Sequence, residues 1–240
     1  MSEAFSLILE AARQAWKPPD RRPVWQWAEE HIVVDKTSPF PGNYKADTSP
    51  WTKELMEIFA DNSVREINVM CAAQTSKTLT SMILLAWAIA EDPGPVMWVT
   101  SNEKQAKRLA RTRLLPIIKN VEKIRSKIIE LDRHEAKTLE INFTDAPLCV
   151  VTARSLDDLQ STPIRWLFCD EARNYPPGAL ETVKKRVRAF WNSRTLIIST
   201  PGEYMDSVHQ GFLAGDQRHY HVCCPQCGHP QRLIWANLKW

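Results

Sequence analysis

The chain has 240 residues, enough to bury a full hydrophobic core in one large domain. Hydrophobic residues make up 44% and charged residues 25%, as in ordinary soluble globular proteins, and the formal net charge of +3 is too small to indicate a nucleic-acid partner by itself. The longest apolar run, Met82–Ala90, is about half of the roughly 18 residues that a membrane span needs, so we expect no membrane partner. The distribution of the six cysteines favours a reducing compartment over a disulfide framework.

The first forty residues have the pattern of an appended N-terminal segment. Helical spacing of apolar residues predicts one helix from Phe5 to Trp16 and a second from Pro23 to His31. The stretch from Thr37 to Trp51 is rich in Pro, Ser, Thr and Gly and predicts an extended connection. A short amphipathic helix is expected from Thr52 to Asn62.

After this connection, strand patterns alternate with helical patterns. Such alternation predicts an α/β fold, with a mostly parallel central sheet, helices on both faces and ligands at the carboxyl ends of the strands. The expected strands are Glu66–Met70, Pro95–Thr100, Leu139–Phe143, Leu148–Thr152, Arg165–Cys169 and Thr195–Ser199, and the expected helices are Lys77–Ala90, Glu103–Ile118 and Gly178–Phe190. The helix that begins at Glu103 is basic, which suits a polyanion partner, although a solvated helical face is the commoner reason for such a charge run.

The stretch from Trp166 to Ala172, WLFCDEA, joins an apolar strand pattern to two adjacent carboxylates, Asp170 and Glu171. In ATPases, a carboxylate at the end of a buried strand binds Mg²⁺ and the next one polarises the attacking water. The same pattern arises when acidic residues cap a helix or face solvent. Other segments must therefore decide between these interpretations.

The segment Cys71–Thr78, CAAQTSKT, follows the first expected strand of the alternation and begins a helix, which is the place of a phosphate-binding loop. Lys77 would reach the phosphate oxygens, and the Thr78 hydroxyl would bind Mg²⁺. The standard pattern GxxxxGK[ST] has glycine where this chain has Cys71 and Ser76. The alternative is an ordinary helix start with Thr75 or Ser76 as the N-cap.

A third polar strand end, TLIISTP, closes the expected strand Thr195–Ser199 with Ser199, Thr200 and Pro201. In ATPases with an extra strand between the phosphate loop and the acidic strand, a polar residue at this point can sense the γ-phosphate. Together, the Lys-Thr pair, the Asp-Glu pair and this strand end match the needs of one ATPase site.

The order and spacing of SPWTKELMEIFAD, QTSKT, WLFCDEARNYP, STP and HVCCPQCG resemble the GpA-type large terminase subunits of tailed bacteriophages, over most of residues 40–240. This resemblance implies a P-loop NTPase fold of the ASCE type and an ATPase motor that hydrolyses ATP with Mg²⁺ to move double-stranded DNA into a procapsid. It also implies the cytoplasm of the infected bacterial host, the terminase small subunit, the portal protein and a homo-oligomeric ring as the setting.

The resemblance also assigns roles to individual residues. Asp170 and Thr78 are expected to bind Mg²⁺, Glu171 to act as the catalytic base, and Ser199 and Thr200 to couple hydrolysis to movement. The expected nucleotide-binding residues are Gln74, Thr75, Ser76, Lys77 and Thr78, with Trp51 as a residue that could stack on adenine. An arginine that neutralises the transition state is expected among Arg108, Arg111, Arg113, Arg186 and Arg188.

Near the end of the chain, Cys224 and Cys227 form a CPQCG half of a zinc knuckle. Two further zinc ligands would have to come from the neighbouring residues His209, His219, His221, Cys223 and His229, or from cysteines that related chains carry beyond this point. The expected domains are an N-terminal segment that contacts the small subunit (1–40), the ATPase domain (41–215) and the zinc-knuckle half with the start of a linker (216–240). We expect no nuclease activity from this chain.

Two other functions remain open at this point. One is a different DNA or RNA translocase, such as a helicase-like ATPase with the same phosphate chemistry. The other is a non-catalytic, zinc-dependent nucleic-acid-binding module in which Asp170 and Glu171 are structural acids.

Overall fold

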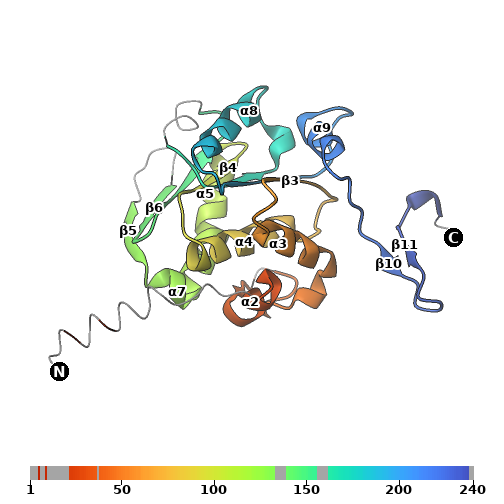
Figure 1. The fold of residues 1–240 in the computed structure, drawn as a ribbon, viewed down its shortest axis with the longest axis horizontal. Coiled ribbons are helices and arrows are strands. Elements are labelled where there is room, and N and C mark those ends of the chain that lie inside the picture. The colour runs from red at the N-terminus through yellow and green to blue at the C-terminus, as the bar shows by residue number, and fades with distance from the viewer. Residues whose placement is uncertain are drawn as a thin grey trace.

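The computed structural model describes residues 22–36, 38–132, 139–155 and 162–237, together with Phe5 and Leu9. Within these residues, the strands form a seven-stranded sheet in the order β3-β9-β8-β4-β7-β6-β5. This sheet lies between helices at the centre of the molecule (Figure 1). The strands are β3 (Glu66–Met70), β4 (Val96–Thr100), β5 (Ile128–Asp132), β6 (Leu139–Phe143), β7 (Pro147–Thr152), β8 (Trp166–Asp170) and β9 (Arg194–Ser199). The run from β3 to β7 is parallel, and β6 and β5 extend it as antiparallel strands.

The parallel strands are apolar on both faces because helices cover both sides of the sheet. On β4, for example, Val96 and Trp98 pack in one core cluster, whereas Met97 and Val99 pack in the other. The strand β8 divides in the same way, since its large aromatic side chains share the first cluster and Leu167 belongs to the second.

The larger core cluster lies between the sheet and the helices α2 (Val24–His31), α3 (Lys53–Ala60), α4 (Lys77–Glu91), α5 (Glu103–Leu109), α6 (Leu115–Asn120) and α7 (Glu122–Arg125). The smaller one lies against α8 (Ala179–Lys184) and α9 (Ser207–Ala214). In Figure 1, α8 and α9 lie on the side of the sheet opposite α2 and α3. A π-helical turn, η3 (Ala110–Leu114), joins α5 to α6.

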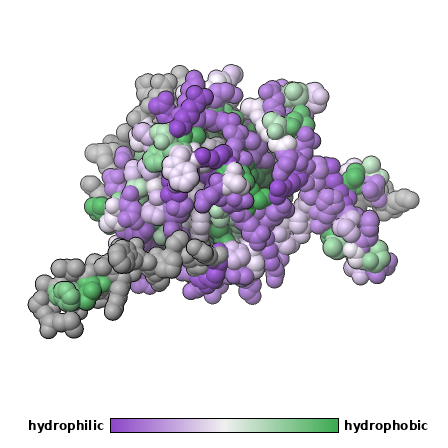
Figure 2. Space-filling model, viewed as in Figure 1, coloured by the Kyte–Doolittle hydropathy of each residue, from purple (hydrophilic) through white to green (hydrophobic). Residues whose placement is uncertain are grey.

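Short elements complete the described chain. They are the two-residue strands β1 (Val33–Val34), β2 (Gly42–Asn43), β10 (Val222–Cys223) and β11 (Pro230–Gln231), and the 3₁₀ turns η1 (Ala46–Thr48), η2 (Pro50–Thr52), η5 (Ala172–Asn174), η6 (Lys185–Ala189) and η7 (Trp235–Asn237). The antiparallel pair β10–β11 extends away from the sheet (Figure 1). Figure 2 shows that the face in view is mostly hydrophilic.

This architecture confirms the predicted α/β fold with a mostly parallel sheet and helices on both faces. Every expected strand is present within about a residue of its predicted bounds, while β5, α7, α9 and the pairs β1–β2 and β10–β11 were not predicted. The predicted helix Phe5–Trp16 lies almost entirely outside the described residues. Trp27 and Ile32, from the expected N-terminal segment, lie in the same core as the sheet. The domain boundaries stay predictions.

No helix in the described part of the chain has both the length and the apolar character needed to cross a membrane.

Candidate active site

The loop between β3 and α4 lies at the carboxyl edge of the sheet. Its first amide, that of Cys71, donates to the carbonyl of Ser199 at 3.1 Å and so extends the pairing of β3 with β9. The carbonyl of Ala72 accepts hydrogen bonds from the Thr75 hydroxyl at 2.8 Å and from the Lys77 ammonium group at 3.0 Å. Two side chains of the loop therefore converge on one carbonyl group, and Lys77, which is 7% exposed, is buried beneath the loop.

Two residues of this loop adopt a backbone conformation that favours glycine. Gln74 has a φ of 58° and Ser76 a φ of 60°. Ser76 occupies the second glycine position of the standard phosphate-loop pattern and immediately precedes α4. The loop thus takes a left-handed turn at the glycine position with a residue that has a side chain.

Asp170, the last residue of β8, is 8% exposed. The Thr78 hydroxyl donates to its Oδ2 at 3.4 Å, whereas its Oδ1 is buried and has no hydrogen-bond partner among the described residues. Burial and, next, the negative charge of Glu171 raise the pKa of Asp170 to about 6, against the opposing charge of Lys77. A buried carboxylate oxygen without a partner is suited to a cation.

Glu171 is the third non-glycine residue at the site, after Gln74 and Ser76, with a left-handed backbone, since its φ is 52°. Its N–H donates to the carbonyl of Ile198 at 2.9 Å, which fixes the turn after β8 against β9. Its Oε1 lies 3.9 Å from the Lys77 Nζ, and its side chain is 31% exposed. The two predicted catalytic side chains, from strands separated by β9, are thus brought together.

The end of β9 completes this edge. Ser199 is fully buried, and its Oγ accepts the N–H of Arg173 at 3.3 Å. The Arg173 guanidinium donates to the carbonyl of Pro201 at 2.8 Å, so the turn after β8 is tied to the turn after β9. The Oγ1 of Thr200 is buried without a hydrogen-bond partner in the described chain.

A cleft of about 1340 Å³ opens over these residues. It exceeds the usual range of small-molecule sites, roughly 300–1,000 Å³. One wall is formed by residues from the segments 33–36 and 38–49, which include β1 and β2, and another by the end of η3 and by α6. Of the predicted site residues, it is lined by Gln74, Ser76, Lys77, Thr78, Glu171, Thr200 and Arg113.

Among the five arginines considered from the sequence, only Arg113 lines the cleft. Two others, Arg108 and Arg111, are exposed on the same helical segment but outside the lining. The remaining pair lies in η6, where a backbone hydrogen bond to Ile164 places this turn beside the start of β8. The amino end of β8 lies at the opposite end of the strand from Asp170 and the site, so η6 is remote from Lys77.

Trp51 contacts the loop from outside the cleft. Its indole N–H donates to the carbonyl of Thr75 at 3.1 Å, and the residue is 41% exposed. An edge-on contact joins it to Tyr220, with ring centroids 6.4 Å apart. Because Trp51 is not part of the cleft lining, its expected stacking on adenine stays a prediction.

Cys224 and Cys227 lie in the turn between β10 and β11. The Gly228 N–H donates to the carbonyl of Cys224 at 2.8 Å, and the backbone N–H groups of Cys227 and Gln226 lower the pKa of the Cys224 thiol. The described residues contain no group of three His, Cys, Asp or Glu side chains placed to hold a metal ion. The residues present therefore do not form a complete zinc site.

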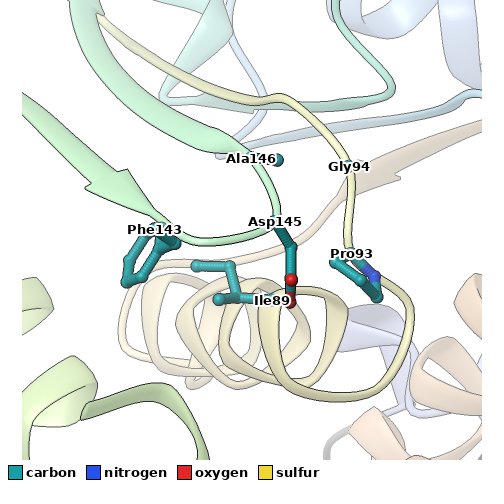
Figure 3. Close-up of a pocket in the computed structure, with 6 residues that line it drawn as sticks. All are labelled: Ile89, Pro93, Gly94, Phe143, Asp145 and Ala146. Atoms are coloured by element: carbon teal, nitrogen blue, oxygen red, sulfur yellow. The ribbon is translucent and has the colours of Figure 1, made fainter. Parts of the chain in front are cut away.

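Figure 3 shows a second, much smaller hollow, where the turn between β6 and β7 meets the end of α4. Its volume of about 10 Å³ is no more than one water molecule needs. It is lined by Ile89, Pro93, Gly94, Phe143, Asp145 and Ala146. None of the predicted site residues is among them, so this hollow belongs to the packing of α4.

The comparison with known families decides the identity of the chain. The family model of the ATPase domain of the phage terminase large subunit gpA matches residues 38–240. The chain belongs to this family. No curated protein sequence matches it.

Solved structures agree with this terminase assignment at the level of the fold. The large terminase of bacteriophage HK97 aligns with a TM-score of 0.61 at 14% identity, over 75% of this chain and 38% of that one. The large terminase ATPase domain of Thermus phage P74-26 aligns with a TM-score of 0.51 at 15% identity, over 70% of this chain and 72% of that one. The predicted P-loop NTPase fold of the terminase ATPase domain is thereby confirmed.

Three residues of this edge were not singled out from the sequence. Ser49 lies in the SPW stretch, and its hydroxyl contacts that of Ser76 at 2.8 Å. Arg173 and Tyr175 lie in the stretch that follows the acid pair, and the Tyr175 hydroxyl donates to the carbonyls of Val99 and Asp170 at 2.7 and 3.1 Å. The only signal for them was their place within stretches that resemble the family.

Proposed function

We propose that this terminase domain hydrolyses ATP with Mg²⁺ and uses the reaction to move double-stranded DNA into a procapsid. The observation that supports it most is the convergence of Lys77, Thr78, Asp170 and Glu171 at one edge of the sheet, although Lys77 and Glu171 follow different strands. This set combines a cation, a hydroxyl group and two carboxylates, the groups that phosphoryl transfer to water needs.

Magnesium fits the residues present. Asp170, whose buried Oδ1 has no partner among the described residues, and the adjacent Thr78 hydroxyl are oxygen donors of the kind that Mg²⁺ prefers. When bound, the ion supplies positive charge that neutralises phosphate oxygens. The raised pKa of about 6 leaves Asp170 mostly ionised at neutral pH, as a ligand must be.

The chain's own groups have separate tasks in the proposed reaction. The N–H groups at the start of α4 and the Lys77 ammonium group bind phosphate oxygens, in exchange for the bond that Lys77 makes to Ala72. Glu171 accepts a hydrogen bond from the attacking water and orients it. Ser199 and Thr200, at the end of the neighbouring strand β9, would transmit the change on hydrolysis, and the Thr200 hydroxyl has no hydrogen-bond partner among the described residues.

DNA would be held through its phosphate backbone. The helical segment from α5 to α6 exposes several cations that have no ion pair in the described chain: Lys104, Arg108, Arg111 and Lys119. Lys107 differs from them, because Glu103 neutralises it at 2.6 Å. Contacts of this kind give affinity without base readout and weaken as salt increases.

The remaining parts of the proposal follow from family membership alone. They are the host cytoplasm as the location, a ring of several copies as the active form, the portal and the small subunit as partners, and residues 1–40 as the small-subunit contact.

The substitution Glu171→Gln tests the catalytic assignment. It removes the charge that orients water but preserves the shape of the side chain, so ATP hydrolysis is expected to cease while ATP binding persists. The matched control is Glu181→Gln on the exposed surface of α8, which should leave turnover unchanged. Undiminished turnover in E171Q would refute the assignment, and strand separation on a tailed duplex would favour a helicase-like enzyme instead.

A further inference from the structure

Ser76 has a left-handed backbone that its residue type rarely adopts, with φ 60° and ψ 15°. A hydrogen bond from outside the loop accompanies this conformation. The Ser76 hydroxyl lies 2.8 Å from the hydroxyl of Ser49, which is 27 residues earlier in the chain and 5% exposed. This partly buried contact between two hydroxyl groups restricts where the Ser76 side chain can point.

The backbone of Ser76 is also held from the side of α4. Both the N–H and the hydroxyl of Thr80 donate to its carbonyl at 2.9 Å. The carbonyl is thus fixed by the helix and the side chain by Ser49. Together these contacts hold the residue in a conformation that only the surrounding structure can maintain.

The segment that supplies Ser49 is itself well fixed. The N–H and the hydroxyl of Thr52 donate to the Ser49 carbonyl at 2.9 and 2.8 Å, and Thr52 is buried. From the same turn, the Trp51 indole donates to the carbonyl of Thr75. One rigid turn therefore contacts two consecutive residues of the loop, and both contacts are hydrogen bonds.

We propose that Ser49 and Trp51 are positioning residues for the phosphate loop: by holding Ser76 and its neighbour Thr75, they keep Ser76 in the left-handed conformation that glycine would adopt without help. They act through the loop and need not touch the nucleotide. Their contribution is to aim the N–H groups at the start of α4 toward the phosphates. This inference rests on the proposed ATP binding by the loop.

Binding of two ligands, ATP and inorganic tripolyphosphate, each with Mg²⁺, tests the proposal by titration calorimetry. Because one neutral hydrogen bond is lost, Ser49→Ala should weaken both ligands by about threefold to tenfold. Trp51→Phe keeps an aromatic ring but loses the indole donor, and it should also weaken both. If W51F weakens ATP alone, the indole recognises the base and its positioning role is wrong.

Rescue separates positioning from general destabilisation. The substitution Ser76→Gly removes the need for the hydroxyl contact, so the double variant S49A/S76G should bind both ligands within about twofold of S76G alone. Ser207→Ala, at an exposed serine of α9, is the matched control and should bind like the wild type. Thermal unfolding of each variant is measured alongside.

The outcomes distinguish the inference from the proposed function. Wild-type affinity in S49A would overturn the inference but not the proposed function. A loss of affinity in S49A that S76G does not rescue, and that accompanies a lower unfolding temperature, would do the same. A wild-type protein that binds neither ligand would overturn the proposed function as well.

Discussion

Replacing Asp170 with Asn should stabilise the metal-free protein at neutral pH while it abolishes ATP hydrolysis. Asp170 is 8% exposed, and its Oδ1 has no partner among the described residues. Burial and the neighbouring negative charge of Glu171 therefore make the charged form of Asp170 unfavourable in the folded state, and the positive charge of Lys77 offsets this cost only in part. Removing the charge removes this penalty, but it also removes the proposed ligand of Mg²⁺.

The magnitude follows from the pKa of the carboxyl group. A rise from 3.8 to about 6 is a shift of about 2 pKa units, or about 3 kcal/mol of free energy of unfolding at 1.36 kcal/mol per unit. Because the pKa in the folded state lies above the unfolded value, the group contributes stability below pH 4 and loses it as the pH rises through 6. Since one end of an Asn amide at this position would still lack a partner among the described residues, we expect the variant to gain about 1–3 kcal/mol at pH 7.5.

The assay is urea unfolding of wild type and D170N in EDTA, from pH 4.5 to pH 7.5. The difference in the free energy of unfolding between the two proteins should be largest at pH 7.5 and should shrink toward pH 4.5, because the other carboxylates titrate alike in both. Parallel pH profiles, or a D170N variant that is less stable at pH 7.5, would refute the reasoning about this buried charge.

Two further predictions concern other contacts. Lys127→Met removes the ammonium group that donates to the carbonyls of Ile89 and Ala90 at 3.1 and 3.3 Å and pairs with Asp145 at 2.7 Å. The free energy of unfolding in urea should fall by about 1–2 kcal/mol, and an unchanged value would mean that this end of α4 is held by other contacts. Arg113→Ala should lower ATP turnover at least about tenfold without DNA, with Arg125→Ala on α7 as the exposed control, and equal turnover in both would assign the catalytic cation elsewhere.

The central strands were predictable because each carries its own local signal. β8 is apolar over four residues and ends in Asp170, and both the apolar run and the acid lie within one short stretch of sequence. The position of β9 between β3 and β8 was suggested only by resemblance to ATPases with an extra strand, since no periodicity reports the order of strands in a sheet.

The contacts that shape the loop could not be predicted, for a physical reason. Ser49 and Ser76 are distant in sequence, and nothing in either residue type predicts a hydrogen bond between them. The positive φ at Gln74, Ser76 and Glu171 was equally hidden, because those residues rarely adopt it without support from the fold. Sequence patterns report local preference, whereas these conformations are imposed by tertiary contacts.

The choice among arginines was also beyond the sequence. A regular α-helix from Glu103 to Ile118 was expected, but η3 has π-helical hydrogen bonds. A π turn contains an additional residue, and it rotates everything after it around the helix axis. The direction of Arg113 relative to Arg108 therefore cannot be derived from a repeat of 3.6 residues.

The placement of β9 has a consequence for how the two halves of the site can move. The carbonyl of Ile198 accepts the Glu171 amide, and the next carbonyl, that of Ser199, accepts the Cys71 amide. The backbone at Glu171, the proposed water-orienting acid, and the backbone at the start of the proposed phosphate loop are therefore attached to consecutive peptide groups of one strand. A sliding displacement of β9 would carry both attachment points in the same direction and preserve their separation, so a mechanical load on this strand would leave the proposed catalytic geometry assembled.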